Sequence, residues 1–160
     1  MTDYYFESKD VGEEGRTRAF SALLDVLGDQ LVWAHVDGYT DYRELPTEVE
    51  LAFERLKAVA LDQYLERWRG PLLNRLFARL GDPLMAVRLD LAIEKHREIL
   101  RVYGPYSIHA EVYRKGDKNS VITIHDCDGI GFDADVQIAA QVEALAGLPP
   151  GSVREVRPGS

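Results

Sequence analysis

Two short runs in which apolar and polar residues alternate, 108–113 and 121–125, place the strongest constraint on how this chain can fold. The segment 116–120 between them is rich in turn residues, so the pattern predicts a β-hairpin. Successive side chains of a strand point to opposite faces, and a shift of one residue in the pairing exchanges those faces. A register with Lys115 opposite Val121 keeps one face of the hairpin apolar, whereas a register shifted by one residue mixes the two surfaces.

The apolar face of this hairpin has to be covered, and apolar residues recur at helical spacing in several other stretches. We expect helices over 19–27, 49–68, 72–80, 83–102 and 134–146. Short strands are expected near 4–6 and 31–36, and the segment 152–157 fits either an edge strand or a frayed tail within 150–160. The elements predict an α+β fold class, with one domain over 1–160. In this domain an antiparallel sheet that contains the hairpin packs against a central group of helices, and about half of the residues are helical.

Two periodicities compete in the stretch 83–102. Alternation at 87–93 is typical of a strand, but an apolar stripe that continues from Leu89 to Tyr103 favours a helix over the whole range. Helix N-termini are predicted from residues of the types that cap helices: Thr47 with Glu50 as a capping box, Asp82 before Pro83, and Asp133.

The composition limits the classes of function. Apolar residues make up 46% and charged residues 29% of 160 residues, which is typical of a soluble globular protein. The formal charge of −8 argues against nucleic acid as a partner, because phosphate contacts need a basic surface. Residues 1–53 contain 12 acidic and 4 basic residues, so a protein partner with a basic surface fits this chain better.

The N-terminal sequence and the single cysteine bear on location. The first ten residues contain neither a basic segment nor an apolar segment of a secretory signal, and no apolar run reaches the roughly 20 residues of a membrane span. Cys127 has no second cysteine with which to form a disulfide. We therefore expect a cytoplasmic protein that has no membrane partner.

The polar face of the hairpin carries the first set of candidate site residues. The register above places Glu111 opposite His125 and His109 opposite Cys127, with Cβ atoms about 5 Å apart. His109, Glu111, His125 and Cys127 are therefore candidate ligands of a divalent metal such as zinc. Alternatively, His109 activates the Cys127 thiolate for nucleophilic chemistry, and Cys127 is then exposed, with a lowered pKa. A solvated face on which Glu111 pairs with His125 is the third alternative.

A second candidate lies at the end of the hairpin, where an apolar strand runs into Asp126, Cys127, Asp128 and Gly129. This pattern resembles the first motif of haloacid-dehalogenase-type phosphotransferases. The resemblance implies Asp126 as the nucleophile, Asp128 as the general acid and base, and a bound Mg²⁺. It covers about nine residues, and that motif normally begins a parallel-sheet domain.

Two other interpretations of the same segment remain open. A calcium loop would use the carboxylates of Asp126, Asp128, Asp133 and Asp135, although the EF-hand spacing is missing. Alternatively, these aspartates accept hydrogen bonds from loop amides and cap the helix that follows.

Two functions follow from these observations. The first is an acidic protein-interaction domain, for example an inhibitor or immunity-type protein that covers a basic partner. The alternative is a metal-dependent hydrolase or phosphohydrolase that uses the hairpin face over 109–128, with His109, Glu111, His125, Asp126, Cys127 and Asp128 as candidate catalytic residues. Whether the chain is an enzyme therefore stays open at this point.

Overall fold

A computed structural model describes residues 2–72 and 81–156 of the chain. In chain order its principal elements are β1 (Thr2–Glu7), α1 (Ser8–Leu27), β2 (Leu31–Val36), α2 (Thr47–Arg69), β3 (Val87–Asp90), α4 (Glu94–Tyr103), β4 (His109–Arg114), β5 (Ile122–His125), β6 (Gly129–Ala134), α5 (Val136–Leu145) and β7 (Arg154–Glu155). The predicted α+β fold class is confirmed.

The strands form one seven-stranded sheet in the order β3-β2-β4-β5-β6-β1-β7, and all of its described pairs are antiparallel. The predicted hairpin is the β4–β5 pair at its centre. The first and last described strands are neighbours at one edge of the sheet, because β1 pairs with both β6 and β7. The C-terminal segment thus contributes an edge strand at 154–155, and residues 157–160 lie outside the described part.

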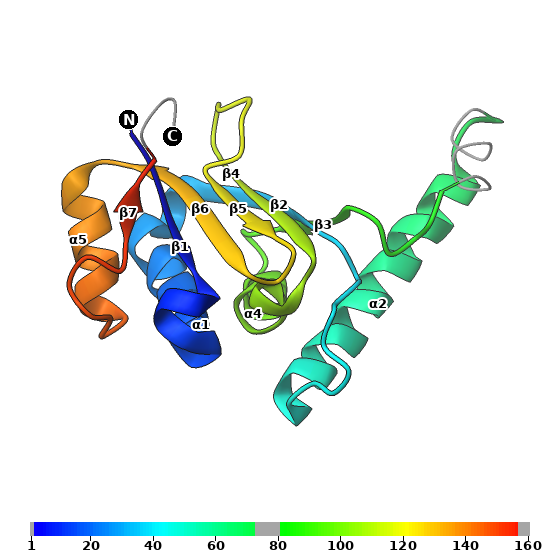
Figure 1. Ribbon diagram of the computed structural model, residues 1–160. Coiled ribbons are helices and arrows are strands. Elements are labelled where there is room, and N and C mark those ends of the chain that lie inside the picture. Colours follow the sequence, from blue (N-terminus) through cyan, green and yellow to red (C-terminus); the bar gives the residue numbers. More distant parts are fainter. Residues whose placement is uncertain (1, 73–80, 157–160) are drawn as a thin grey trace.

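Helices α1, α4 and α5 lie along one face of the sheet (Figure 1). The strand side chains that point toward them are apolar and fully buried, including Ala34, Val112, Ile122, Ile124 and Ile130. No helix of the described residues covers the opposite face (Figure 1), and its side chains are half-buried or exposed. We call this surface the open face of the sheet.

Helix α2 lies outside this layer of helices. It contacts α4 and the edge strand β3, and its C-terminal end extends away from the rest of the described chain (Figure 1). Leu56 and Ala60 are buried on the side that faces α4 and β3. None of the described helices is long and apolar enough to span a membrane.

The prediction of one helix over 83–102 is wrong. Residues 87–90 form the edge strand β3, in which Val87 and Leu89 are buried and alternate with exposed residues. The helix α4 begins only at Glu94. The alternation of apolar and polar residues therefore indicated the correct structure for 87–90, because Val87 and Leu89 extend the apolar face of β2.

The three predicted helix caps also differ from the structure. Pro46, not Thr47, is the N-cap of α2, and its carbonyl accepts the amides of Val49 and Glu50. Asp82 accepts the Leu84 amide in a turn and begins no helix. The helix predicted over 72–80 falls mostly outside the described residues, which omit 73–80.

The last helix begins at Val136, two residues later than expected, and Asp135 caps it by accepting the amides of Gln137 and Ile138. Asp133 belongs instead to the strand β6, which the prediction missed. Because residues 129 and 131 are glycines, the sequence does not show a clear alternation of apolar and polar residues in this strand, although Ile130 and Phe132 are buried.

Candidate functional site

The hairpin register differs from the predicted one by two residues. His109 lies opposite His125, Glu111 opposite Thr123, and Ala110 opposite Ile124. A shift of two keeps every side chain on its predicted face. His109, Glu111 and His125 therefore do lie on the open face, but the pairs expected between Glu111 and His125 and between His109 and Cys127 are wrong.

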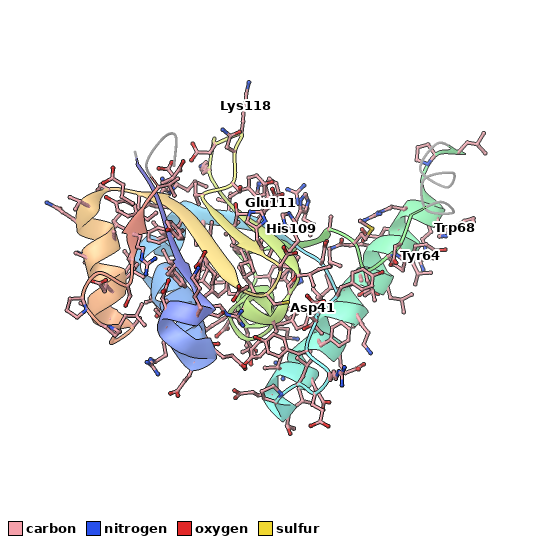
Figure 2. All side chains as sticks on the ribbon, viewed as in Figure 1. Asp41, Tyr64, Trp68, His109, Glu111 and Lys118 are labelled. Atoms are coloured by element: carbon pink, nitrogen blue, oxygen red, sulfur yellow. The ribbon has the colours of Figure 1, made fainter. Side chains whose placement is uncertain are left out.

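The pairings align side chains in rows across the open face. One row contains Asp90, Trp33 and Tyr113, and the next contains Arg88, His35, Glu111, Thr123, Gly131, Tyr5 and Arg154. His109 and His125 stand in the third row, and Figure 2 shows His109 and Glu111 on the side of the sheet away from α4. Each row thus collects residues that are far apart in the sequence.

An aromatic stack lies at the β2–β4 side of this surface. The rings of Trp33 and Tyr113 are nearly parallel, with centroids 3.7 Å apart, and His35 meets Trp33 edge-on at 4.8 Å. The Arg88 guanidinium lies 5.0 Å from the Trp33 ring centroid, a cation–π arrangement. Trp, Tyr and Arg are the residue types that most often dominate the energy of protein interfaces.

Glu111 links this stack to the histidines. Its Oε2 accepts a hydrogen bond of 2.7 Å from the Tyr113 hydroxyl, and its Oε1 lies 3.8 Å from His109 Nε2. Burial, together with Glu111, raises the pKa of Tyr113 to about 12. Burial also lowers the pKa of His35 from its ordinary value, against the opposing effect of Glu111. The Tyr113 hydroxyl therefore keeps its proton at neutral pH and can donate the hydrogen bond to Glu111.

The candidate metal ligands do not converge. The ring centroids of His109 and His125 are 5.6 Å apart, and Cys127 is not on this face. Among the residues that the structure describes, no group of three or more His, Cys, Asp and Glu side chains is placed to hold a metal ion. The described residues of the hairpin face therefore contain no such group, and the catalytic role that the alternative function assigns to them stays a prediction.

Cys127 lies in the turn between β5 and β6 and faces the interior. Its side chain is buried, and Sγ donates to the Tyr106 carbonyl at 3.1 Å. Burial raises the pKa of the Cys127 thiol, against hydrogen bonds from the Asp41 amide and the Thr40 hydroxyl. The expectation of an exposed thiol with a lowered pKa is therefore wrong, because Cys127 follows the end of β5 instead of continuing it.

The aspartates of the second candidate occupy the same turn. Asp126 and Cys127 both have positive φ, 50° and 54°, and the Asp128 amide donates to the His125 carbonyl at 3.0 Å. This geometry closes a hairpin between antiparallel strands. The parallel-sheet setting that the resemblance to haloacid-dehalogenase-type phosphotransferases implies is therefore missing from the described sheet. Asp135, the last residue of the proposed calcium loop, caps α5.

Carboxylates border the open face on several sides. Asp90 and Glu111 flank the aromatic stack, while Asp3 and Asp133 face each other across β1 and β6.

Between these two groups of carboxylates, Gly131 leaves a hollow of about 260 Å³ that Tyr5, Thr123 and His125 also line. A groove of about 570 Å³ runs from His35 and Arg88 to Gln63 and Arg67 of α2. The surface thus offers recesses for side chains of a partner.

Trp33 and His35 belong to the strand predicted near 31–36, but the sequence pattern indicated no role for them. Arg88 was missed altogether, because its segment was expected to be helical. One sequence signal could have found the stack. Trp33 and Tyr113 each alternate with buried apolar residues in their strands, which places both side chains on the same face of the sheet.

Comparisons of this chain with protein-family models, with curated proteins and with solved structures found no match.

Proposed function

We propose that this protein is a protein-binding domain whose open face receives a partner with a basic surface, as an inhibitor or immunity-type protein would. The observation that carries the proposal is the stack of Trp33, Tyr113 and Arg88 on a face that no described helix covers. Large aromatic side chains surrounded by polar ones are typical of the centre of a protein interface.

Charge favours a basic partner. Glu111 and Asp90 lie beside the stack, and Asp3 and Asp133 lie on the far side of the hollow over Gly131. A basic side chain of the partner would meet Glu111 and Asp90 beside the stack, or Asp3 and Asp133 beside the hollow. Such complementary charges speed encounter and set orientation. The same carboxylates would repel phosphate groups, so we do not expect nucleic acid as the partner. With its buried and unpaired thiol, the chain suits the reducing cytoplasm.

The proposal is tested by charge reversal on the open face. Proteins retained from a lysate of the source organism by the native chain are compared with those retained by Glu111→Lys, and each differential partner is purified for direct binding. Glu111→Lys should weaken binding about tenfold or more, since it places a like charge against the basic partner. Binding should also weaken as salt is added.

Asp117→Lys is the matched control. Asp117 is exposed in the β4–β5 turn, and this substitution changes the net charge of the chain by the same amount as Glu111→Lys. Circular dichroism of both variants establishes that they fold. A partner that binds native protein and both variants with equal affinity would contradict the proposal, as would the absence of any partner that depends on Glu111.

A further inference from the structure

Helix α2 exposes an apolar stripe on the side that faces away from the body of the protein. The side chains of Leu61, Leu65 and Trp68 are 55%, 40% and 38% exposed. Spacings of four and three residues align them on one side of the helix, and Tyr64 joins them through an edge-on contact with Trp68 at 6.1 Å. Figure 2 shows Tyr64 and Trp68 at the far end of α2.

The opposite side of α2 is the one that contacts the rest of the fold. The Gln63 side chain donates to the Arg88 carbonyl at 2.6 Å and accepts the Arg88 amide at 3.2 Å. Gln63 lies about 160° around the helix from Leu61 and Leu65, at 100° per residue. The stripe therefore has no contact surface of its own within the described chain, although large exposed apolar patches usually mark interaction sites.

We propose that this stripe is a dimer interface, in which α2 packs against α2 of a second copy of the chain in antiparallel orientation. Two-fold pairing of this kind places Leu61 against Trp68 of the partner subunit, with Leu65 and Tyr64 meeting near the axis. The stripe is compatible with this arrangement because its large residues are distributed symmetrically about position 64–65.

Charges beside the stripe select a second copy of this chain as the occupant. Asp62 and Arg69 lie on the same flank of α2, seven residues apart, and both are exposed. Neither makes an ion pair with any residue that the structure describes. In an antiparallel pair of helices the same flanks meet, so Asp62 faces Arg69 of the second copy and Arg69 faces its Asp62. The flank is thus complementary to itself.

The length of the stripe sets the expected affinity. Stable interfaces bury about 1,200–2,000 Å² in total, and a contact of two to three helical turns lies at or below the lower end of that range. We therefore expect a reversible dimer with a dissociation constant on the order of 1–100 μM. The open face is not part of this contact, so the dimer forms independently of the proposed function.

Sedimentation equilibrium tests the interface over a range of concentrations. The native chain should approach twice its 18.0 kDa mass. Leu65→Asp should raise the dissociation constant at least about tenfold, as expected for loss of a central apolar contact. Leu145→Asp is the matched control, since Leu145 is 67% exposed on α5, and it should dimerise like the native chain.

A charge-exchange experiment tests the antiparallel pairing and does not depend on removing apolar residues. Arg69→Glu and Asp62→Arg should each weaken self-association, because each variant carries like charges on the flank. A mixture of the two variants should form a heterodimer with near-native affinity. In that heterodimer the two acidic residues on the flank of one variant face the two basic residues on the flank of the other. A monomeric native chain up to about 100 μM, a dimer insensitive to Leu65→Asp, or a mixture as weak as the separate variants would overturn the proposal.

Discussion

Asp126 offers a sharp test of whether the turn between β5 and β6 has a structural or a chemical role. Its φ of 50° is left-handed, its side chain is exposed, and that side chain has no hydrogen bond or ion pair with the described residues. A left-handed conformation costs an L-residue about 1–2 kcal/mol, and less for Asp. Glycine adopts it freely but loses about 0.5–1 kcal/mol more backbone entropy on folding.

The difference between these two effects sets the expected free energies of unfolding. Asp126→Gly should be between neutral and about 1 kcal/mol more stable than the native chain. Asp126→Val should be about 1–2 kcal/mol less stable, because a β-branched residue fits a positive φ poorly. Urea denaturation followed by tryptophan fluorescence measures both changes.

Asp128 supplies the comparison within the same turn, since its φ is not left-handed. Asp128→Gly should therefore destabilise the protein by about 0.5–1 kcal/mol, and Asp128→Val should have little effect. If Asp126→Gly destabilises the fold more than Asp128→Gly does, the backbone strain assigned to Asp126 is not present and the reasoning fails.

Three further predictions concern buried or half-buried groups. In the folded protein Cys127 should react with iodoacetamide more slowly than a free thiol, because burial raises its pKa, and it should react rapidly after denaturation. His109→Ala should leave the rate unchanged, and fast labelling of the native protein would contradict the buried position of Cys127. Burial lowers the folded-state pKa of His35 from 6.5, so the unfolded chain binds the proton more readily, and stability should fall as the pH is lowered below about 6.5. His35→Gln should flatten this part of the stability profile, and an NMR titration of His35 with a midpoint above 6.5 would refute the sign. Arg16 is fully buried, and its Nη2 donates to the Tyr42 hydroxyl, whereas its Nε and Nη1 have no partner among the described residues. The Arg16→Met variant should therefore range from equally stable to a few kcal/mol more stable than the native chain in urea denaturation. A loss of 3 kcal/mol or more would instead indicate a well-paired charge.

Much of the fold could be predicted because alternation identifies which face of a strand is buried. The face assignments of the β4–β5 hairpin were correct, since any even register keeps Ile122 and Ile124 inside. The exact pairing depends on where each strand ends, which alternation alone does not determine. An error of two residues there was enough to place Cys127 wrongly beside His109.

The candidate site was predicted less well because it depends on neighbours that are distant in sequence. His109 and Glu111 were placed on the correct surface, but Arg88 reaches Trp33 only because 87–90 forms an edge strand. In that stretch both the helical and the alternating pattern were present. The buried face of β2 needed a neighbour, and this tertiary requirement is not visible in the local sequence.

The most direct test of the proposed function is crosslinking from the open face itself. A photoreactive amino acid is introduced at Thr123, in the middle of this face, and in a second variant at Gln141, which is exposed on the helix α5 behind the sheet. After irradiation in cells of the source organism, mass spectrometry identifies the adducts. We predict adducts from position 123 with a protein whose crosslinked segment is rich in lysine and arginine, and none with that protein from position 141. Equal adducts from both positions, or adducts from position 141 alone, would contradict the account.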